Sequence, residues 1–202
     1  PKLLPGLNFI AGLNGETEES YRMNLELLRS MREEGLWLRR INIRQVEGQG
    51  FQEIPERTFR KFKREVREGI DRPLLEEMLP LGTVLRGVWW ESHDDRIRRP
   101  EQVLDPKHRD EAIRGVAGIT FGRQIGAYPI LVGLPYKVPL ESSTDVIVTG
   151  HGMRSITGVE AGMDVNTATQ HQLEAIPGIG SKGAWRLVSA RAKASTKGGL
   201  DS

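Results

Sequence analysis

The feature that most constrains the fold is segment 166–191, which reads NTATQHQLEAIPGIGSKGAWRLVSAR. Thr169 followed by Gln172 is a capping-box pattern, in which two side chains satisfy free backbone N–H groups at the start of a helix. We therefore expect a short helix through residues 173–176. Residues 177–180 follow as Pro-Gly-Ile-Gly, a pattern typical of a tight turn. The segment is thus predicted to begin as a helix that ends in a glycine turn.

A second helix is predicted to follow this turn, because Ser181 has a hydroxyl group that can cap its start. Its inward positions are expected to be Ala184, Leu187 and Val188. Glycines leave room for a phosphate group to approach backbone N–H groups at the positive end of a helix. Lys182 and Arg186 add positive charge at the same place. The sequence therefore predicts a site for phosphate groups.

This stretch resembles the helix-hairpin-helix family in its apolar-Pro-Gly-Ile-Gly turn, the small Ala184 and the apolar Leu173, Ile176 and Val188. The resemblance implies that backbone amides bind a nucleic-acid backbone without reading base edges. The predicted nucleic-acid-binding residues are Gly178, Gly180, Ser181, Lys182, Gly183 and Arg186. The resemblance also implies that a monovalent cation can bind to the carbonyl oxygens of Glu174, Ile176 and Ile179. The alternative is a helix pair that docks against another protein.

Charge is nearly balanced over the 202 residues, with 29 Lys and Arg against 27 Asp and Glu, so any binding of a polyanion is expected to be local. From residue 165 onward, five basic residues stand against two acidic ones. The chain has no cysteine, which excludes disulfides, thiolate zinc sites and cysteine-ligated iron–sulfur clusters within it. No apolar run approaches the roughly 20 residues that span a membrane. We expect a cytoplasmic protein with no membrane partner.

Residues 1–50 are predicted to form a strand, a helix and a second strand. Residues 7–10 are apolar, residues 21–31 carry apolar side chains at helical spacing up to Gly35, and residues 38–46 alternate. Strands connected through a helix normally pair in parallel. Two such strands alone expose open edges and half a core. We therefore interpret them as the remnant of a larger parallel β/α barrel, whose N-terminal part is missing.

Residues 51–80 are interpreted as a helical connector with one basic amphipathic helix at 55–71. Its apolar stripe consists of Phe59, Phe62, Val66 and Ile70. The surrounding basic residues are Arg57, Arg60, Lys61, Lys63, Arg64 and Arg67. The basic side is either solvated or in contact with phosphate. Arg72-Pro73 should interrupt this helix, so that a second short helix follows.

Residues 81–162 have the pattern of a small antiparallel β-barrel. The predicted strands are residues 83–91, 118–123, 129–132 and 144–149, with a charged insertion at 94–117 that includes a possible helix at 108–116. Adjacent Trp89 and Trp90 should point to opposite faces of a strand. The outward ring either stacks on a base or packs against a neighbouring segment. Trp185 is predicted to pack in a core or between domains, and no side-chain metal site is predicted.

A second resemblance lies in segment 12–19 (GLNGETEE), between an apolar strand and a helix that leads to LRRINIRQV. This unit resembles the late strand-loop-helix unit of radical S-adenosylmethionine enzymes, which usually have proline where this chain has Asn14. The resemblance implies that Asn14, Gly15 and Glu16 contact the cofactor. The segments RGVWWE, ITFGRQIGAYPILVGLP and TDVIVTGHGMRSITGVE are similar to the RNA-binding TRAM barrel of tRNA methylthiotransferases. The matching motifs are residues 121–123 (FGR) and 155–158 (SITG).

The order of these parts resembles the C-terminal part of archaeal radical S-adenosylmethionine proteins and implies an α+β multidomain fold. A helix-hairpin-helix at 163–194 and a flexible tail at 195–202 would complete it. The resemblance implies S-adenosylmethionine and a 4Fe-4S cluster in the full-length protein, whereas this chain lacks the cluster cysteines and should be inactive alone. The implied function is delivery of nucleic acid, RNA rather than DNA, for modification of a tRNA-like substrate. The alternatives are a non-enzymatic DNA- or RNA-binding protein and a module that contacts only protein.

Overall fold

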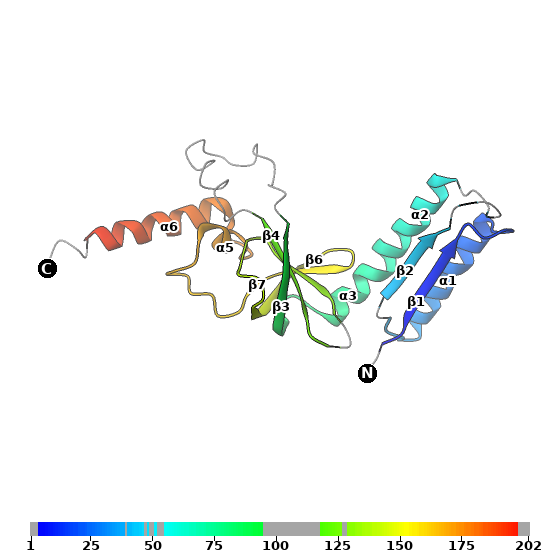
Figure 1. Cartoon of the computed structure of the whole chain (residues 1–202), viewed down its shortest axis with the longest axis horizontal. Helices are drawn as coiled ribbons and strands as arrows, with labels where there is room; N and C mark the ends of the chain where they lie inside the picture. Colours follow the sequence, from blue (N-terminus) through cyan, green and yellow to red (C-terminus); the bar gives the residue numbers. More distant parts are fainter. Residues whose placement is uncertain are drawn as a thin grey trace. The chain divides into compact units, whose positions relative to one another are not determined.

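The computed structural model describes residues 4–38, 40–46, 48, 51, 55–94, 118–126 and 129–197. The chain divides into two compact units, which consist of residues 1–80 with 151–154 and residues 81–150 with 155–202 (Figure 1). The fold is α+β, as predicted, with a small parallel sheet and a five-stranded mixed sheet. The predicted helix at 108–116 lies outside the described residues.

The first unit begins with the predicted strand, helix and strand: β1 (Gly6–Ala11), α1 (Glu18–Glu33) and β2 (Arg40–Gln45). The two strands pair in parallel, with Leu7 opposite Ile41. Alternation along the strands sends Leu7 and Ile41 to one face of the sheet, where the core lies. The prediction of a parallel strand-helix-strand unit is therefore confirmed.

Helix α2 (Glu56–Val66) supplies the second layer of this core. Its buried Phe62 packs edge-to-face on Phe9 of β1, with ring centroids 6.0 Å apart, and lies 5.2 Å from the ring of Tyr21 in α1. Val66 and Ile70 continue the same buried stripe. The expectation that the two strands would have only half a core is therefore wrong for this face, because the stripe of the basic helix covers it.

The helix does not break at Pro73, contrary to the prediction. A π-helical turn (Arg67–Asp71) joins α2 to α3 (Arg72–Met78), so that the three run on as one rod (Figure 1). Proline has no N–H to donate to the carbonyl four residues earlier. That carbonyl belongs to Gly69, and it accepts a hydrogen bond from Nη1 of Arg32 in α1 at 3.2 Å. The missing backbone bond is thus replaced by a side chain.

The opposite face of the β1–β2 sheet is polar. The Asn42 side-chain amide donates to Oδ1 of Asn8 on the neighbouring strand at 2.8 Å. Arg40 and Arg44 are exposed on β2, as is Ile10 on β1. The sheet thus has one apolar face under helices and one face with polar, charged and apolar side chains in contact with solvent.

The second unit contains a closed five-stranded barrel in the order β3-β4-β5-β7-β6. Its strands are β3 (Val84–Asp94), β4 (Ile119–Gln124), β5 (Leu131–Leu134), β6 (Ser143–His151) and β7 (Ser155–Glu160). The strand β5 pairs with β7 in parallel, so the prediction of an antiparallel barrel is wrong for this pair. Strand β3 also extends to Asp94, where the insertion was predicted to begin.

The barrel core is built around aromatic and β-branched side chains. Trp90 is fully buried, and its Nε1–H donates to Oγ1 of Thr144 at 3.1 Å, whereas Trp89 is 38% exposed. The expectation that the two rings point to opposite faces is therefore confirmed. The hydroxyl of the buried Tyr136 accepts a hydrogen bond from the backbone N–H of Glu160 at 3.0 Å. Each buried polar group named here has a partner, as a closed core requires.

Two glycines allow the barrel strands to approach one another. A Cβ atom on Gly122 would lie 2.3 Å from the carbonyl oxygen of Trp89 and 2.6 Å from the ring of Trp90. A Cβ atom on Gly158 would lie 2.2 Å from Cγ1 of Val146. Any larger residue at these positions must displace backbone or a core side chain. These glycines belong to the FGR and SITG motifs, which therefore have a packing function here.

Candidate nucleic-acid interface

The predicted glycine turn joins two helices, α5 (Gln170–Glu174) and α6 (Gly180–Lys197), in what we call the helical hairpin (Figure 1). The capping box is confirmed, because the backbone N–H of Gln172 donates to Oγ1 of Thr169 at 3.3 Å and the N–H of Thr169 donates to Oε1 of Gln172 at 2.8 Å. Helix α6 continues through Lys197, so the first residues of the predicted flexible tail are helical.

The turn between the helices requires glycine for its backbone conformation as well as for the approach of a phosphate group. Gly178 and Gly180 have φ angles of 89° and 58°, in the left-handed region that other residues rarely adopt. No atom beyond the chain neighbours lies within 4 Å of the position that a Cβ would take on either residue. The turn is closed by a hydrogen bond from Ile179 N–H to the carbonyl of Ile176 at 3.1 Å. Both glycines therefore present open backbone.

Ser181 does not precede the second helix as predicted. Helix α6 begins at Gly180, so Ser181 lies in its first turn, where its hydroxyl helps to lower the pKa of the Glu174 carboxylate in α5. A carboxylate next to the first turn of a helix complements the positive end of the helix. Ser181 therefore lies in the first turn of α6 and is exposed there.

The hairpin has a small core of its own. Leu173 and Ala184 are fully buried with Ala168, and the apolar side chains packed around them are Met163, Ile176, Ile179 and Val188. A Cβ on Gly183 would lie 3.0 Å from Cγ2 of Ile179, so this glycine allows close packing of the turn on α6. Leu187 is 42% exposed, so the prediction that it points into the hairpin core is wrong; Trp185 is 47% exposed, which contradicts a core position, and its alternative position between domains stays a prediction. The five-residue α5 covers only a narrow stripe of α6.

The predicted phosphate-binding residues lie within the turn and the first two turns of α6. Gly178, Gly180 and Ser181 are exposed, and so are the side chains of Lys182 and Arg186. Residues four apart on a helix lie on the same face, so both cations flank one side of the helix start. The helix end, the open glycine backbone and two positive charges are thus brought together.

Arg191 is a positioning residue of the hairpin that the sequence did not reveal. Its Nη1 donates to the carbonyl oxygen of Val165 at 2.8 Å, and its Nη2 donates to that of Ala168 at 2.7 Å. This side chain fixes α6 to the segment before α5. In the sequence it is one cation among several in a basic tail, with no spacing that indicates its partners.

The predicted cation site remains a prediction. The carbonyl oxygen of Ile176 already accepts the N–H of Ile179, although a carbonyl has a second lone pair for a further partner. Over the described part of the chain, no group of three or more His, Asp or Glu side chains is placed to hold a metal ion. Nor does any described helix have the length and apolar character needed to cross a membrane.

Glu174 should make the hairpin sensitive to acid. Its pKa is held below the usual 4.5, chiefly by the neighbouring His171, whose Nδ1 lies 3.7 Å from the Glu174 Oε2, and further by the hydrogen bond that Gln170 donates at 2.9 Å. A carboxylate with a lowered folded-state pKa stabilises the fold above about pH 4.5 and loses this contribution as the pH falls through the lowered pKa. Glu174→Gln should therefore be less stable than the parent near pH 6, with a smaller difference near pH 3. Hydrogen exchange of α5 and α6 measures both stabilities; an equal difference at the two pH values would contradict this assignment.

Glu16 holds together the loop at residues 12–16, which was predicted to contact a cofactor. The Glu16 carboxylate accepts the backbone N–H of Gly12 at 2.6 Å and the hydroxyl of Tyr21 at 3.0 Å. Burial, followed by this hydrogen bond, raises the pKa of Tyr21. Asn14 and Gly15 are exposed beyond the carboxyl end of β1. Glu16 therefore fixes the loop shape, and Asn14 and Gly15 form its outer surface.

Comparison with known proteins gives relatives but no family. No protein-family model matches the chain. An uncharacterized protein of Archaeoglobus fulgidus is 39% identical over 188 residues, which cover 88% of this chain and 31% of that protein. An uncharacterized protein of Methanocaldococcus jannaschii is 36% identical over 169 residues, 78% of this chain and 27% of that protein. The chain thus spans less than a third of the length of these two archaeal relatives.

Proposed function

We propose that this chain binds nucleic acid through its sugar-phosphate backbone, with the helical hairpin as the main contact. The observation that carries the proposal is the pair of exposed glycines, Gly178 and Gly180, at the start of an 18-residue helix flanked by Lys182 and Arg186. Backbone N–H groups at a helix start favour phosphate oxygens. Such contacts carry no base specificity, so binding should be independent of sequence and strongly dependent on salt. We therefore infer that the helical hairpin is a helix-hairpin-helix module.

The barrel supports RNA as the ligand. Its strand order, with the third and fifth strands in parallel, is the order found in OB-type barrels, whose outer face binds oligonucleotides. Trp89 is exposed on β3 directly opposite Arg123 on β4, and Phe121 lies on β4 over Gly133 of β5. An exposed ring beside a cation suits stacking on an unpaired base. We therefore infer that the barrel is of the TRAM or OB type.

We further propose that the chain is the C-terminal portion of a radical S-adenosylmethionine enzyme that modifies RNA. The parallel β1–β2 pair under two helices and the greater length of both relatives support this proposal. Asn14 and Gly15 lie beyond the carboxyl end of β1, where we propose that they contact the cofactor. Glu16 instead holds the loop in position through its hydrogen bonds with Gly12 and Tyr21. The cofactor would supply the radical chemistry. This chain has no cysteine to bind the 4Fe-4S cluster, so a part of the longer protein outside this chain would hold it.

The hairpin proposal is tested by Lys182→Ala and Gly180→Val in the full chain. A short RNA duplex is titrated at several salt concentrations. Lys182→Ala should make the negative slope of log K against log[salt] shallower by about 0.9, which corresponds to the loss of one phosphate contact. Gly180→Val should reduce binding more, because a β-branched side chain both obstructs the phosphate and strains a left-handed residue by about 1–2 kcal/mol. Arg29→Ala, which removes an exposed cation from α1, is the control with an equal charge change.

Circular dichroism of each variant separates lost binding from lost folding. If both hairpin variants are folded and bind duplex and single-stranded RNA as the parent does, the hairpin does not bind the backbone. A protein-docking function would then take its place. The exposed Trp185 and Leu187 on α6 favour this second candidate, because large apolar side chains in contact with solvent are typical of docking surfaces.

A further inference from the structure

Helix α2 carries an uncovered row of positive charge on the side opposite the core. The four exposed residues Arg57, Arg60, Lys61 and Arg64 form what we call the α2 basic face. At about 100° per residue, their positions fall within an arc of about 100° around the helix. Together with Glu56 they line a shallow depression. The row is about 10 Å long, since the seven steps from residue 57 to residue 64 rise about 1.5 Å each.

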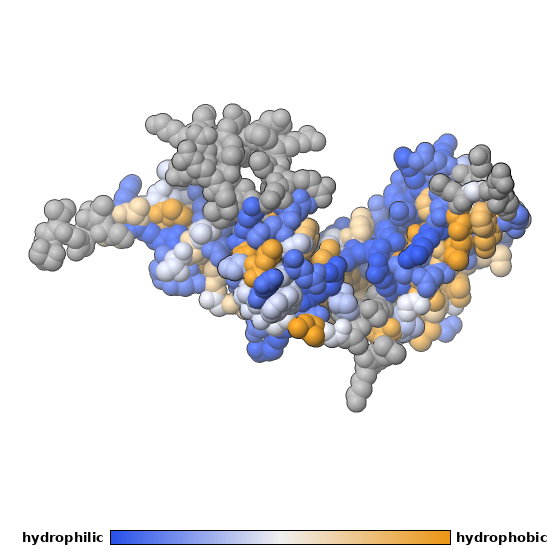
Figure 2. Space-filling model, viewed as in Figure 1, coloured by the Kyte–Doolittle hydropathy of each residue, from blue (hydrophilic) through white to orange (hydrophobic). Residues whose placement is uncertain are grey.

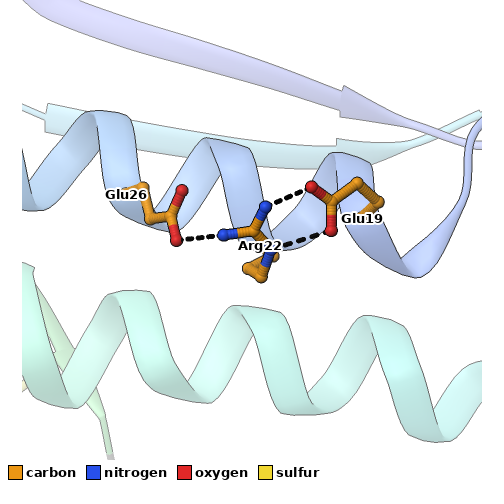
Figure 3. A network of polar contacts seen from close by, with 3 residues as sticks. All are labelled: Glu19, Arg22 and Glu26. Carbon is orange, nitrogen blue, oxygen red and sulfur yellow. Dashed lines mark hydrogen bonds and ion pairs between the residues drawn. The ribbon is translucent and has the colours of Figure 1, made fainter.

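The neighbouring helix shows what a neutralised helix surface looks like. In α1, Arg22 lies between Glu19 and Glu26 and pairs with both of them (Figure 3). On the α2 basic face only Arg60 has such a partner, Glu56. Among the residues that the structure describes, no acidic side chain forms an ion pair with Arg57, Lys61 or Arg64. Neighbouring like charges on a helix destabilise it slightly. A ligand with several negative charges would relieve this repulsion.

The α2 basic face differs from the surface of a helix that inserts into a membrane. A membrane-surface helix inserts its apolar face among the lipids. The apolar face of α2 is used within the protein, where Phe62 and Val66 are buried. Within the described residues 55–78, no large hydrophobic side chain is strongly exposed. The α2 side of the first unit is hydrophilic in the space-filling view (Figure 2).

The chemistry of the row favours phosphates. Three of the four residues are arginines, whose planar guanidinium groups form paired hydrogen bonds with phosphate oxygens. A straight row of cations matches a polymer with regularly spaced negative charges better than a single small anion. Nucleic acid presents such a row, with about one charge per 1.7 Å of duplex axis.

We propose that the α2 basic face is a second contact for a nucleic-acid backbone, separate in the chain from the helical hairpin. The choice of nucleic acid over an acidic protein rests on the proposed function. The contact itself rests on Arg57, Lys61 and Arg64 of α2, which form no ion pair with the residues that the structure describes. This proposal assigns a binding role to the first unit, whereas the hairpin and the barrel both belong to the second unit.

The test is a triple variant of the full chain, Arg57→Gln, Lys61→Gln and Arg64→Gln, which keeps the Arg60–Glu56 pair and good helix-forming residues. The probe is an RNA duplex of about 20 base pairs. Loss of three duplex contacts should make the negative slope of log K against log[salt] shallower by about 2.7. The affinity advantage of the parent should therefore shrink about 40-fold between about 50 and 200 mM salt. The matched control removes three exposed cations outside α2: Arg22→Gln, Arg29→Gln and Arg72→Gln.

The outcomes separate this inference from the hairpin proposal. If the α2 triple variant has the salt slope of the control while Lys182→Ala and Gly180→Val lose binding, the α2 contact is refuted and the hairpin proposal stands. If the triple variant loses slope while the hairpin variants bind normally, the α2 contact stands and the hairpin proposal fails. If the triple variant instead loses only binding to polyglutamate or to anionic vesicles, the α2 basic face is not a nucleic-acid contact. Circular dichroism verifies that the triple variant remains helical.

Discussion

Replacing Arg67 with alanine is expected to lower the free energy of unfolding of the first unit by about 3–5 kcal/mol, the cost of breaking a buried ion pair by removing one partner. The Arg67 and Asp71 side chains pair with each other and are only 11% and 10% exposed. Nη1 of Arg67 also donates to the carbonyl of Ile41 in β2 at 2.8 Å. Burial raises the pKa of Asp71 against the opposing effect of Arg67. Without Arg67, a buried carboxylate and a strand carbonyl would both lose their donor.

The matched control for this prediction lies one turn further along the same rod. Arg72 pairs with Glu76 at the same four-residue spacing, but both side chains are about half exposed. Arg72→Ala should therefore cost at most about 1 kcal/mol. Hydrogen exchange resolved by peptide reports the stability of β2 and α2 separately from that of the barrel. Equal effects of the two substitutions would show that burial of the Arg67–Asp71 pair has no energetic importance.

A single methyl group at Gly122 should destabilise the barrel by about 3 kcal/mol, the upper end of the usual range for overpacking. The Cβ of Gly122→Ala would lie 2.3 Å from the carbonyl oxygen of Trp89, a backbone atom that cannot move without shifting β3. It would also meet the ring of Trp90, which fills the core. Neither atom is the end of a flexible side chain. We therefore expect both strands to separate locally.

Gly126→Ala provides the comparison within the same barrel. Gly126 has no atom within 4 Å of its would-be Cβ and no left-handed φ angle. This substitution should be neutral or stabilising by up to about 1 kcal/mol, because alanine restricts the unfolded chain. Hydrogen exchange of peptides from β4 and β6 measures both effects. A Gly122→Ala barrel as protected as the Gly126→Ala barrel would rule out the close approach.

Local pattern was sufficient for most of the elements. A short apolar run predicted β1, period-two alternation predicted β2, and helical spacing predicted α1 and the apolar stripe of α2. The partner of that stripe was not predictable, because periodicity shows that a face is buried without showing what covers it. Pro73 was misjudged for a similar reason. The cost of its missing N–H depends on Arg32, which lies far away in the sequence and replaces the bond to Gly69.

The capping box and the turn of the helical hairpin were easier to predict from the sequence, because they depend on residues close together in the chain. The capping box at Thr169 and the glycine turn depend on neighbours within a few residues. Leu187 was predicted to point inward with Ala184 and Val188, whereas the five-residue α5 leaves it exposed on α6. The parallel β5–β7 pair was missed because pairing direction in a barrel is set by its closure, which no single strand reveals.

Closure of the barrel has a consequence during synthesis of the chain. Val84 at its beginning pairs with Ile147, and β5 finds its parallel partner only in β7. Pairings between residues so distant in sequence form slowly, whereas the helical hairpin depends on contacts between near neighbours. Strands β3 to β6 therefore emerge from the ribosome with unpaired edges before β7 is available. During this interval they are exposed to edge-to-edge aggregation, from which the finished barrel is protected.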